Sequence, residues 1–232
     1  NHKETKGLPI DFGGMRSTGI SISAYANLLK YLKIDEIPVM YDIFQQLAQP
    51  SETVIKITGG DVVQAHRLCP AFGIDIKNYK VTQLPSGITA KVPKDYNPVT
   101  EDGNQYLYVN GILTAKMPSN GLYFDLCHFP FSNIEYASQL NESQFTGITD
   151  EEIEFVSEEV KFLYNNTDKA ILFAFGGNIF EGAQSAFGFE NYMQQLLLNP
   201  KLIHRWSELQ TAQYISDLKK LLPVISPYIN II

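Results

Sequence analysis

Apolar and polar positions repeat with helical spacing in three long stretches of the chain. Between residues 22 and 32 the apolar side chains recur three or four positions apart, which predicts an amphipathic helix up to about residue 33. A second helix is predicted from Thr149, which has the capping-box spacing to Glu152, to about residue 164. A third begins at Asn199-Pro200, a good N-cap followed by proline at the first helical position, and extends to about residue 222.

Short apolar runs between these stretches predict buried strands. The runs lie at residues 8–12, 61–65, 170–175 and 228–232. A short helix that follows Ser51 and ends at Gly59-Gly60 precedes the second run. Because strand and helix alternate along the chain, we predict a parallel sheet with helical crossovers.

Residues 79–118 have a different pattern, with alternating apolar and polar positions in several short runs. Asn110-Gly111 separates the last two runs and favours a type I′ turn, which needs positive φ at both central residues. We interpret this section as an antiparallel β-hairpin insertion into the βα order.

The strand count limits the possible folds. Four parallel strands are half of a (β/α)8 TIM barrel, whose usual length is about 250 residues. The 232 residues here cannot hold eight units beside a long insertion. The pattern therefore predicts either an open α/β sheet or a truncated barrel that covers about the first four βα units. No Gly/Ser-rich linker divides the chain, so residues 1–232 are interpreted as a single domain.

Composition and charge narrow the classes of partner. The chain has 44% hydrophobic and 19% charged residues, as globular proteins do. Its formal net charge of -7 argues against a nucleic-acid surface. No apolar run approaches the roughly 20 residues that span a bilayer, and there is no signal-peptide pattern. We therefore expect a cytoplasmic protein that binds a small molecule, with no nucleic-acid or membrane partner.

Both ends of the sequence suggest a fragment. The chain starts at Asn1 without an initiator methionine and stops inside the apolar run 228–232. A truncated barrel would expose the edge of this last strand, with Ile229, Ile231 and Ile232 on it. Since open apolar edges pair with other chains, we predict self-association there.

Polar residues that follow the predicted strands are the candidates for substrate binding, because ligands meet the C-terminal ends of parallel strands. They are Asp11, Arg16, His66, Arg67, Gly177 and Asn178. Parallel strands would bring Arg16, His66 and Asn178 to a common mouth.

Each candidate also has a structural interpretation. Arg16 is a fork-shaped donor suited to carboxylate or phosphate, or a surface residue before a helix. His66 and Arg67 are neighbours, so in a strand they point to opposite faces. His66 could equally be a hydrogen-bonded structural imidazole. Gly176-Gly177 could release the chain from its strand and let Asn178 present a neutral amide to a ligand, or form a structural turn.

The sequence provides no catalytic residue and no metal ligands by itself. His2, His128 and His204 have no cysteine or carboxylate at metal-ligand spacing. Cys69 and Cys127 are interpreted as ordinary reduced thiols.

Several segments in order resemble the uroporphyrinogen decarboxylase superfamily, which includes cobamide-dependent methyltransferases that act on coenzyme M and related thiols. The segments are NHKET with LPIDFG near the N-terminus, FQQLAQP at 44–50, GDVV at 60–63, FGG at 175–177 with EG at 181–182, GFEN at 188–191 and NP at 199–200. The resemblance implies a (β/α)8 barrel with a deep pocket at its C-terminal face, and a chain that ends near the fourth strand.

The decarboxylase branch is matched incompletely. Met15-Arg16 is similar to the pair that follows its first strand, but Ile20 stands where the decarboxylases have a second arginine. Their essential aspartate falls near Arg67 and Leu68, where no carboxylate is present. Without it, the cation that develops on the tetrapyrrole lacks its electrostatic stabilisation. Their pocket tyrosine corresponds best to Asn178.

The methyltransferase branch does not require those acids. The resemblance implies transfer of a methyl group from methylcobamide to a thiol or related acceptor, assisted by zinc, which lowers the pKa of the thiol. The zinc ligands of that branch would fall beyond Ile232, so this fragment is expected to hold no cofactor and to be inactive alone. A corrinoid protein would be its partner. The alternatives are a uroporphyrinogen decarboxylase with an altered pocket and a non-catalytic small-molecule binding module.

Overall fold

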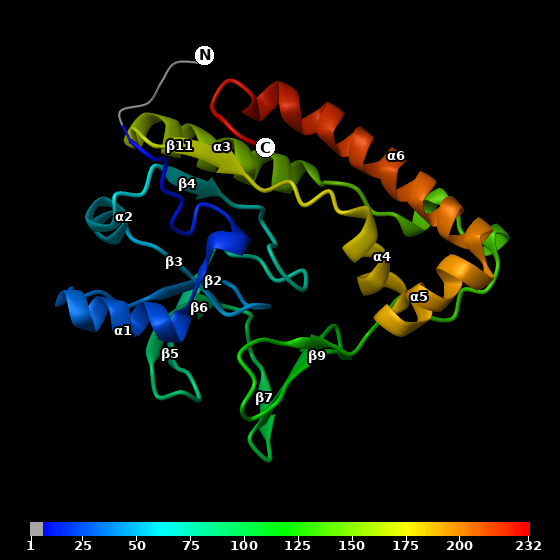
Figure 1. Cartoon of the computed structure of the whole chain (residues 1–232), viewed down its shortest axis with the longest axis horizontal. Coiled ribbons are helices and arrows are strands. Elements are labelled where there is room, and N and C mark those ends of the chain that lie inside the picture. Colours follow the sequence, from blue (N-terminus) through cyan, green and yellow to red (C-terminus); the bar gives the residue numbers. More distant parts are fainter. Residues whose placement is uncertain (1–6) are drawn as a thin grey trace.

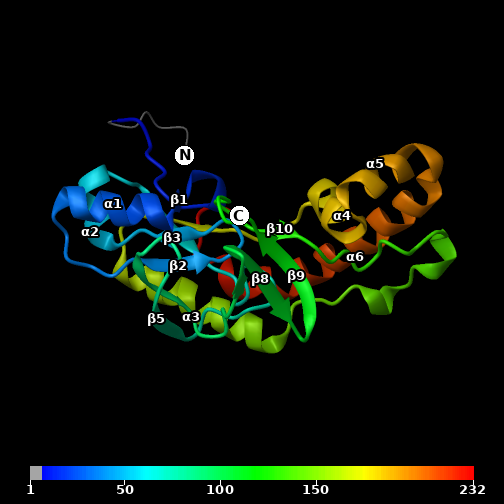
Figure 2. The same ribbon diagram turned by 90° about the horizontal axis from the view of Figure 1, so that it is seen from below.

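The structure is a computed structural model, and it describes residues 7–232. The segment NHKET and His2 lie outside the described residues. Two groups of elements lie at opposite ends of the molecule (Figures 1 and 2). The helices α1 and α2 and a five-stranded sheet form one end, and α4 and α5 form the other. Helix α3 (Asp150–Asn166) lies along the first end, and the long helix α6 (Pro200–Ile225) extends from α3 to α4 and α5.

The five-stranded sheet has the order β1-β3-β2-β6-β5. Its strands are β1 (Ile20–Ser21), β2 (Val39–Asp42), β3 (Leu47–Gln49), β5 (Tyr79–Gln83) and β6 (Thr89–Pro93). Only β2 and β6 pair in parallel, with Val39 opposite Lys91. Helix α1 (Ile22–Leu32) packs beside this sheet through its apolar side chains, among them Tyr25 and Leu29.

The four-stranded sheet is antiparallel throughout, with the order β10-β9-β8-β7. It consists of β7 (Val99–Glu101), β8 (Asn104–Val109), β9 (Ile112–Met117) and β10 (Asp125–Leu126). The turn between β8 and β9 has positive φ at Asn110 (50°) and Gly111 (78°), so the predicted hairpin is confirmed.

A two-stranded parallel sheet joins β4 (Val62–Ala65) and β11 (Ala170–Phe173), with Ala170 opposite Val62. Ile231 adds a single parallel bridge to Leu172. Helix α2 (Glu52–Thr58) precedes β4, and α3 (Asp150–Asn166) precedes β11. Side chains of α3 and of the C-terminal part of α6 pack on one face of this sheet.

Three further helices follow β11: α4 (Ile179–Phe187), α5 (Phe189–Leu198) and α6 (Pro200–Ile225). Gly188, with φ of 85°, separates α4 from α5. They enclose a separate apolar cluster that contains the buried Trp206 and Phe187. Short 3-10 turns lie at Arg16–Thr18, Ala137–Gln139 and Glu142–Gln144.

Two predicted helix starts are confirmed by their capping bonds. The Ser51 hydroxyl accepts the Val54 N–H (3.4 Å), and the Thr149 hydroxyl accepts the Glu152 N–H (3.2 Å). The predicted N-cap at Asn199 makes no side-chain capping bond to α6. Its side-chain amide donates to the Glu135 carbonyl (2.6 Å) instead. The helix still begins at Pro200, whose fixed φ suits the first helical position.

The structure contains no barrel, so the predicted truncated TIM barrel of four βα units is wrong. The sheets are open and separate. Residues 8–12 form no strand: Pro9 lacks an N–H, and the Asp61 carboxylate accepts the Ile10 N–H (2.9 Å) where a ladder would need a main-chain carbonyl. The runs 61–65 and 170–175 form the predicted parallel ladder, and the run 228–232 joins it only through the parallel bridge between Ile231 and Leu172.

The predicted insertion is also a larger part of the fold than a hairpin. Its first two strands, β5 and β6, complete the five-stranded sheet, and the others build the four-stranded one. The open barrel edge on which we based self-association does not exist, so that prediction loses its basis and remains untested. Within residues 7–232, no helix is long and apolar enough to cross a membrane.

Candidate functional site

Tyr41 and His66 form the centre of the candidate site. Tyr41 lies on β2, and His66 directly follows β4, so two different sheets meet here. Their ring centroids are 4.3 Å apart, with the planes tilted by 37°. Gln49 at the end of β3 completes the contact, because its Oε1 lies 2.5 Å from His66 Nε2.

The His66 imidazole is neutral at physiological pH. It is buried, and burial lowers its pKa to about 4. Because the Gln49 Oε1 can only accept, its hydrogen bond with the ring requires the tautomer that has the proton on Nε2. The other ring nitrogen, Nδ1, then offers a lone pair, and it is buried without a hydrogen-bond partner among the described residues.

The Tyr41 hydroxyl is also buried without a partner in the described part of the chain. Burial raises its pKa, the Asp42 carboxylate adds to this, and the Arg16 guanidinium opposes it. Tyr41 therefore keeps its proton and can donate it in a hydrogen bond. Two rings in contact thus each carry a buried polar atom without a partner, a donor on Tyr41 and an acceptor on His66.

Arg16 and Asp42 form an ion pair next to Tyr41. The Arg16 Nε contacts the fully buried Asp42 carboxylate, and its Nη2 donates to the Pro70 carbonyl (2.9 Å). The Arg16 side chain remains 43% exposed, so it is the solvent-facing member of the pair. Asp42 neutralises its charge, which lowers its capacity to bind a further carboxylate.

Asp11 shapes the loop that presents Arg16. Its carboxylate accepts the Gly14 N–H (2.7 Å) and the Thr18 hydroxyl (3.0 Å). Gly14 has no room for a side chain, because a Cβ would lie 2.6 Å from Asp11 Oδ1 and 2.7 Å from Val62. Asp11 thus acts on the site through the loop and through its charge near Tyr41.

Glu159 of α3 binds the chain at the end of β4. Its Oε2 accepts the His66 N–H at 2.9 Å. Burial raises the pKa of this carboxyl to about 8, although the bond from His66 works in the opposite direction. Glu159 is therefore mostly protonated at neutral pH, and the interior of the site carries little net charge.

The predicted opposite directions of His66 and Arg67 are found in the structure. His66 contacts Tyr41 and Gln49, whereas Arg67 contacts α3 on the other face of the sheet. The Arg67 guanidinium binds both oxygens of Glu152, at 2.6 Å and 3.0 Å. It also donates to the Phe175 carbonyl (3.4 Å). Such a bidentate pair holds two segments together.

Asn178 and Gly177 lie near Arg67, away from His66. The Tyr214 hydroxyl donates to the Asn178 carbonyl (3.4 Å), and the Tyr214 ring meets Phe175 edge to face. The Asn178 amide donates to Glu181 (3.2 Å). A Cβ on Gly177 would meet the Phe175 ring at 3.2 Å.

The six sequence-derived candidates therefore divide into two groups. Asp11, Arg16 and His66 surround Tyr41, and we call this the Tyr41 site. Arg67, Gly177 and Asn178 surround Tyr214, in what we call the Tyr214 cluster. The predicted common mouth of Arg16, His66 and Asn178 is not formed, because β11 is followed by a segment that leads toward α4 (Figure 1).

Four residues of the Tyr41 site were not predicted from the sequence: Tyr41, Asp42, Gln49 and Glu159. Gln49 belongs to the segment FQQLAQP, which the family resemblance includes, but nothing in the local pattern pairs it with His66. The short apolar run at residues 39–41 was the available signal for β2.

Zinc does not fit the described residues. Between residues 7 and 232, no group of three or more His, Cys, Asp or Glu side chains could hold a metal ion. Cys69 and Cys127 are free thiols in different parts of the chain. No step that involves zinc is therefore assigned to this chain.

No protein-family model matches this chain, and neither does any curated protein or solved structure. The resemblance to the uroporphyrinogen decarboxylase superfamily therefore remains a prediction from the sequence.

Proposed function

We propose that the Tyr41 site binds a small neutral molecule with an S–H or O–H group, as the acceptor site of a corrinoid-dependent methyltransferase. One observation carries this proposal: the Tyr41 hydroxyl and His66 Nδ1 are both buried with no hydrogen-bond partner in the described residues, on two rings whose centroids are 4.3 Å apart. A bound thiol or alcohol would donate to Nδ1 and accept from Tyr41, so both polar atoms would be satisfied at once.

The reaction class comes from the sequence resemblance, and methylcobamide would be a second substrate. In the transfer, the acceptor sulfur bonds to the methyl carbon, the carbon–cobalt bond breaks with its electron pair left on cobalt, and the sulfhydryl proton goes to solvent. We assign no proton abstraction to His66, because a pKa of about 4 makes it a weak base. Its role is to accept a hydrogen bond and orient the acceptor.

The charges favour this proposal over tetrapyrrole decarboxylation. A substrate with eight carboxylates needs free arginines, and Arg16 is already paired with Asp42. A non-catalytic binding module is the second candidate. The weak basicity of His66 favours it.

A combined binding and turnover experiment tests the proposal. The neutral thiols 1-thioglycerol and 2-mercaptoethanol are titrated into the protein by calorimetry, and each is then incubated with methylcobalamin while the S-methyl product is measured by mass spectrometry. We expect binding that Tyr41→Phe and His66→Leu weaken about tenfold, which corresponds to one buried hydrogen bond. Asn178→Ala, in the Tyr214 cluster, is the matched control and should change nothing.

Three outcomes are distinct. Methylated thiol supports the methyltransferase. Binding without methylation supports the site as a thiol-binding site without turnover by this chain, as both the binding module and an inactive fragment of a methyltransferase predict. No binding of either thiol, or binding that Tyr41→Phe leaves unchanged, contradicts the assignment of the site.

A further inference from the structure

A cavity of about 970 Å³ lies between α2, β4 and the C-terminal end of α3. It is distinct from the Tyr41 site, since neither Tyr41 nor His66 lines it, although Gln49 borders both. Ile55 of α2 and Leu163 of α3 form apolar walls, and Gln64 of β4 is on its inner side.

The cavity exposes a strand edge. The Ala170 N–H donates to the Asp61 carbonyl (2.8 Å), so this carbonyl and the main-chain groups of residues 63 and 65 face β11. The main-chain N–H and C=O of Gln64 therefore face the opposite edge of β4. Such an edge can pair with another extended chain.

The chain itself closes both ends of this edge. The Asp61 N–H donates to the Ile10 carbonyl (2.7 Å), and the His66 N–H donates to Glu159 (2.9 Å). The residues between these two bonds, Val62–Ala65, span about 13 Å at 3.3 Å per residue, and of them Val63 and Gln64 line the cavity. The length fits a peptide of about three residues and excludes a long strand.

The Gln64 side chain offers a further acceptor. The residue is 8% exposed, and its Oε1 is buried with no hydrogen-bond partner in the part of the chain that the structure describes. A buried amide oxygen without a partner is unfavourable, so a ligand N–H here would be stabilising.

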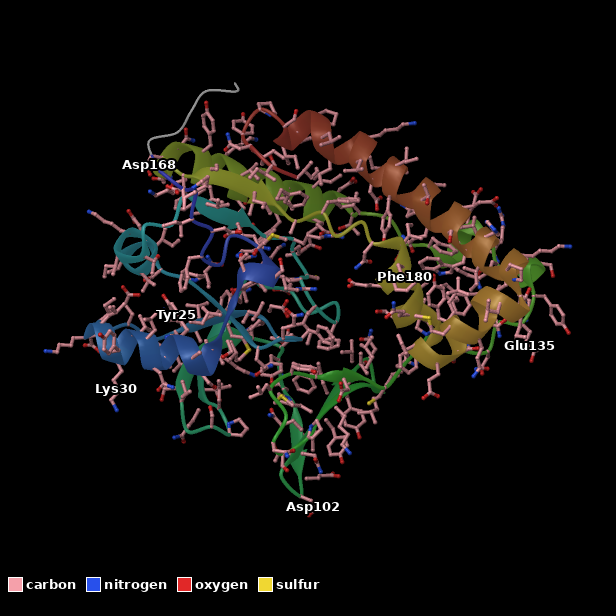
Figure 3. The ribbon with its side chains drawn as sticks, viewed as in Figure 1. Tyr25, Lys30, Asp102, Glu135, Asp168 and Phe180 are labelled. Atoms are coloured by element: carbon pink, nitrogen blue, oxygen red, sulfur yellow. The ribbon has the colours of Figure 1, made fainter. Side chains whose placement is uncertain are left out.

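Charges of both signs surround the cavity. Lys56 and Glu52 come from α2, and Asp168 and Lys169 come from the turn before β11, where Figure 3 labels Asp168. Lys169 Nζ lies 3.5 Å from Asp168, whereas Lys56 and Glu52 have no ion-pair partner within residues 7–232. Two cations and two anions match a ligand that carries one charge of each sign.

We propose that this cavity binds a short free peptide, extended along the edge of β4 and about three residues long. The peptide main chain pairs with the N–H and C=O of Gln64. Its terminal carboxylate and ammonium lie near the lysines and the acids of the rim. An apolar side chain packs between Ile55 and Leu163.

The tripeptide Ala-Leu-Ala tests this proposal by isothermal titration calorimetry. We expect measurable binding below about 1 mM. N-methylation of the leucine removes one main-chain donor and should weaken binding threefold to tenfold, as about one hydrogen bond would. Acetylation of the N-terminus with amidation of the C-terminus removes both charges and should weaken binding by about the same factor.

Protein variants complete the test. Lys56→Ala should weaken the free tripeptide and leave the capped one unchanged, and Gln64→Leu should weaken both. Lys30→Ala on α1, whose side chain points outward in Figure 3 and does not line the cavity, is the matched control. Thermal unfolding confirms that each variant is folded.

Three results would overturn the proposal: no binding at about 1 mM, equal affinity for the N-methylated peptide, or dimerisation of the chain that the peptide displaces. The last would identify the occupant as a second copy. Peptide binding at this cavity does not depend on Tyr41 or on thiol binding at the Tyr41 site. The two proposals can therefore fail independently.

Discussion

The Tyr41 site and the Tyr214 cluster lie on opposite faces of the same short parallel sheet, yet their polar groups differ in one respect. Around Tyr214 the polar atoms bind one another: Arg67 binds Glu152, and the tyrosine hydroxyl binds Asn178. Around Tyr41 two buried atoms, the hydroxyl and His66 Nδ1, have no partner in the described residues. A satisfied cluster holds segments together, whereas an unsatisfied one has capacity for a ligand.

The largest effect on stability is expected in the Tyr214 cluster, where the polar atoms bind one another. Arg67→Met should lower the free energy of unfolding by about 3 kcal/mol, because it leaves the Glu152 carboxylate, only 13% exposed, without its bidentate partner. Urea unfolding measures this. Asn178→Ala, in the same cluster but exposed, should change stability by less than about 0.5 kcal/mol. A loss below about 1 kcal/mol for Arg67→Met would show that the pair is not structural.

The second effect is a pH dependence of the free energy of unfolding, which arises from Glu159 and His66 at the Tyr41 site. The raised pKa of Glu159, about 8, contributes stability that is present at low pH and is lost as pH rises through 8. The lowered pKa of His66, about 4, contributes stability that is present above its ordinary value and is lost as pH falls toward 4.

These two dependences oppose each other between about pH 4.5 and 6.5, so Glu159 dominates only above this range. We expect the free energy of unfolding to fall by about 2 kcal/mol between pH 6.5 and 8. Glu159→Gln keeps an acceptor for the His66 N–H and should remove this slope. Chemical unfolding at several pH values measures the slope of the free energy of unfolding against pH. An unchanged slope in the variant would exclude Glu159 as the origin of the pH dependence.

A smaller effect, a gain in stability, is expected when the Tyr41 hydroxyl is removed. Tyr41→Phe removes a buried hydroxyl without a partner and should stabilise the ligand-free protein by about 1 kcal/mol. Tyr214→Phe removes a hydroxyl that has a partner and should be neutral or slightly destabilising. Thermal unfolding of both variants compares the two regions directly. Destabilisation by Tyr41→Phe would mean that its hydroxyl is already satisfied.

Local chemistry explains which parts of the fold could be predicted. The caps at Ser51 and Thr149 and the turn at Asn110-Gly111 depend on neighbouring residues only, and all three are confirmed. The barrel failed because the strand expected at residues 8–12 depends on a distant side chain, Asp61, which occupies the Ile10 N–H. Apolar runs indicate burial, but they do not show which main-chain groups are free to pair.

The candidate site was predictable to a similar degree. The alternation of side chains along a strand was enough to place His66 and Arg67 on opposite faces. The partners of His66 were not predictable, since Gln49 and Glu159 lie 17 and 93 residues away. Contacts at such separations follow from the packing of whole sheets and leave no trace in the local pattern.

Nitrogen-15 NMR of the His66 ring tests the central claim most directly, because it identifies which ring nitrogen carries the proton. We predict a neutral imidazole at pH 6, protonated on Nε2, with an Nδ1 resonance that shifts when a thiol is added. An imidazolium at pH 6, or a proton on Nδ1, would contradict this claim.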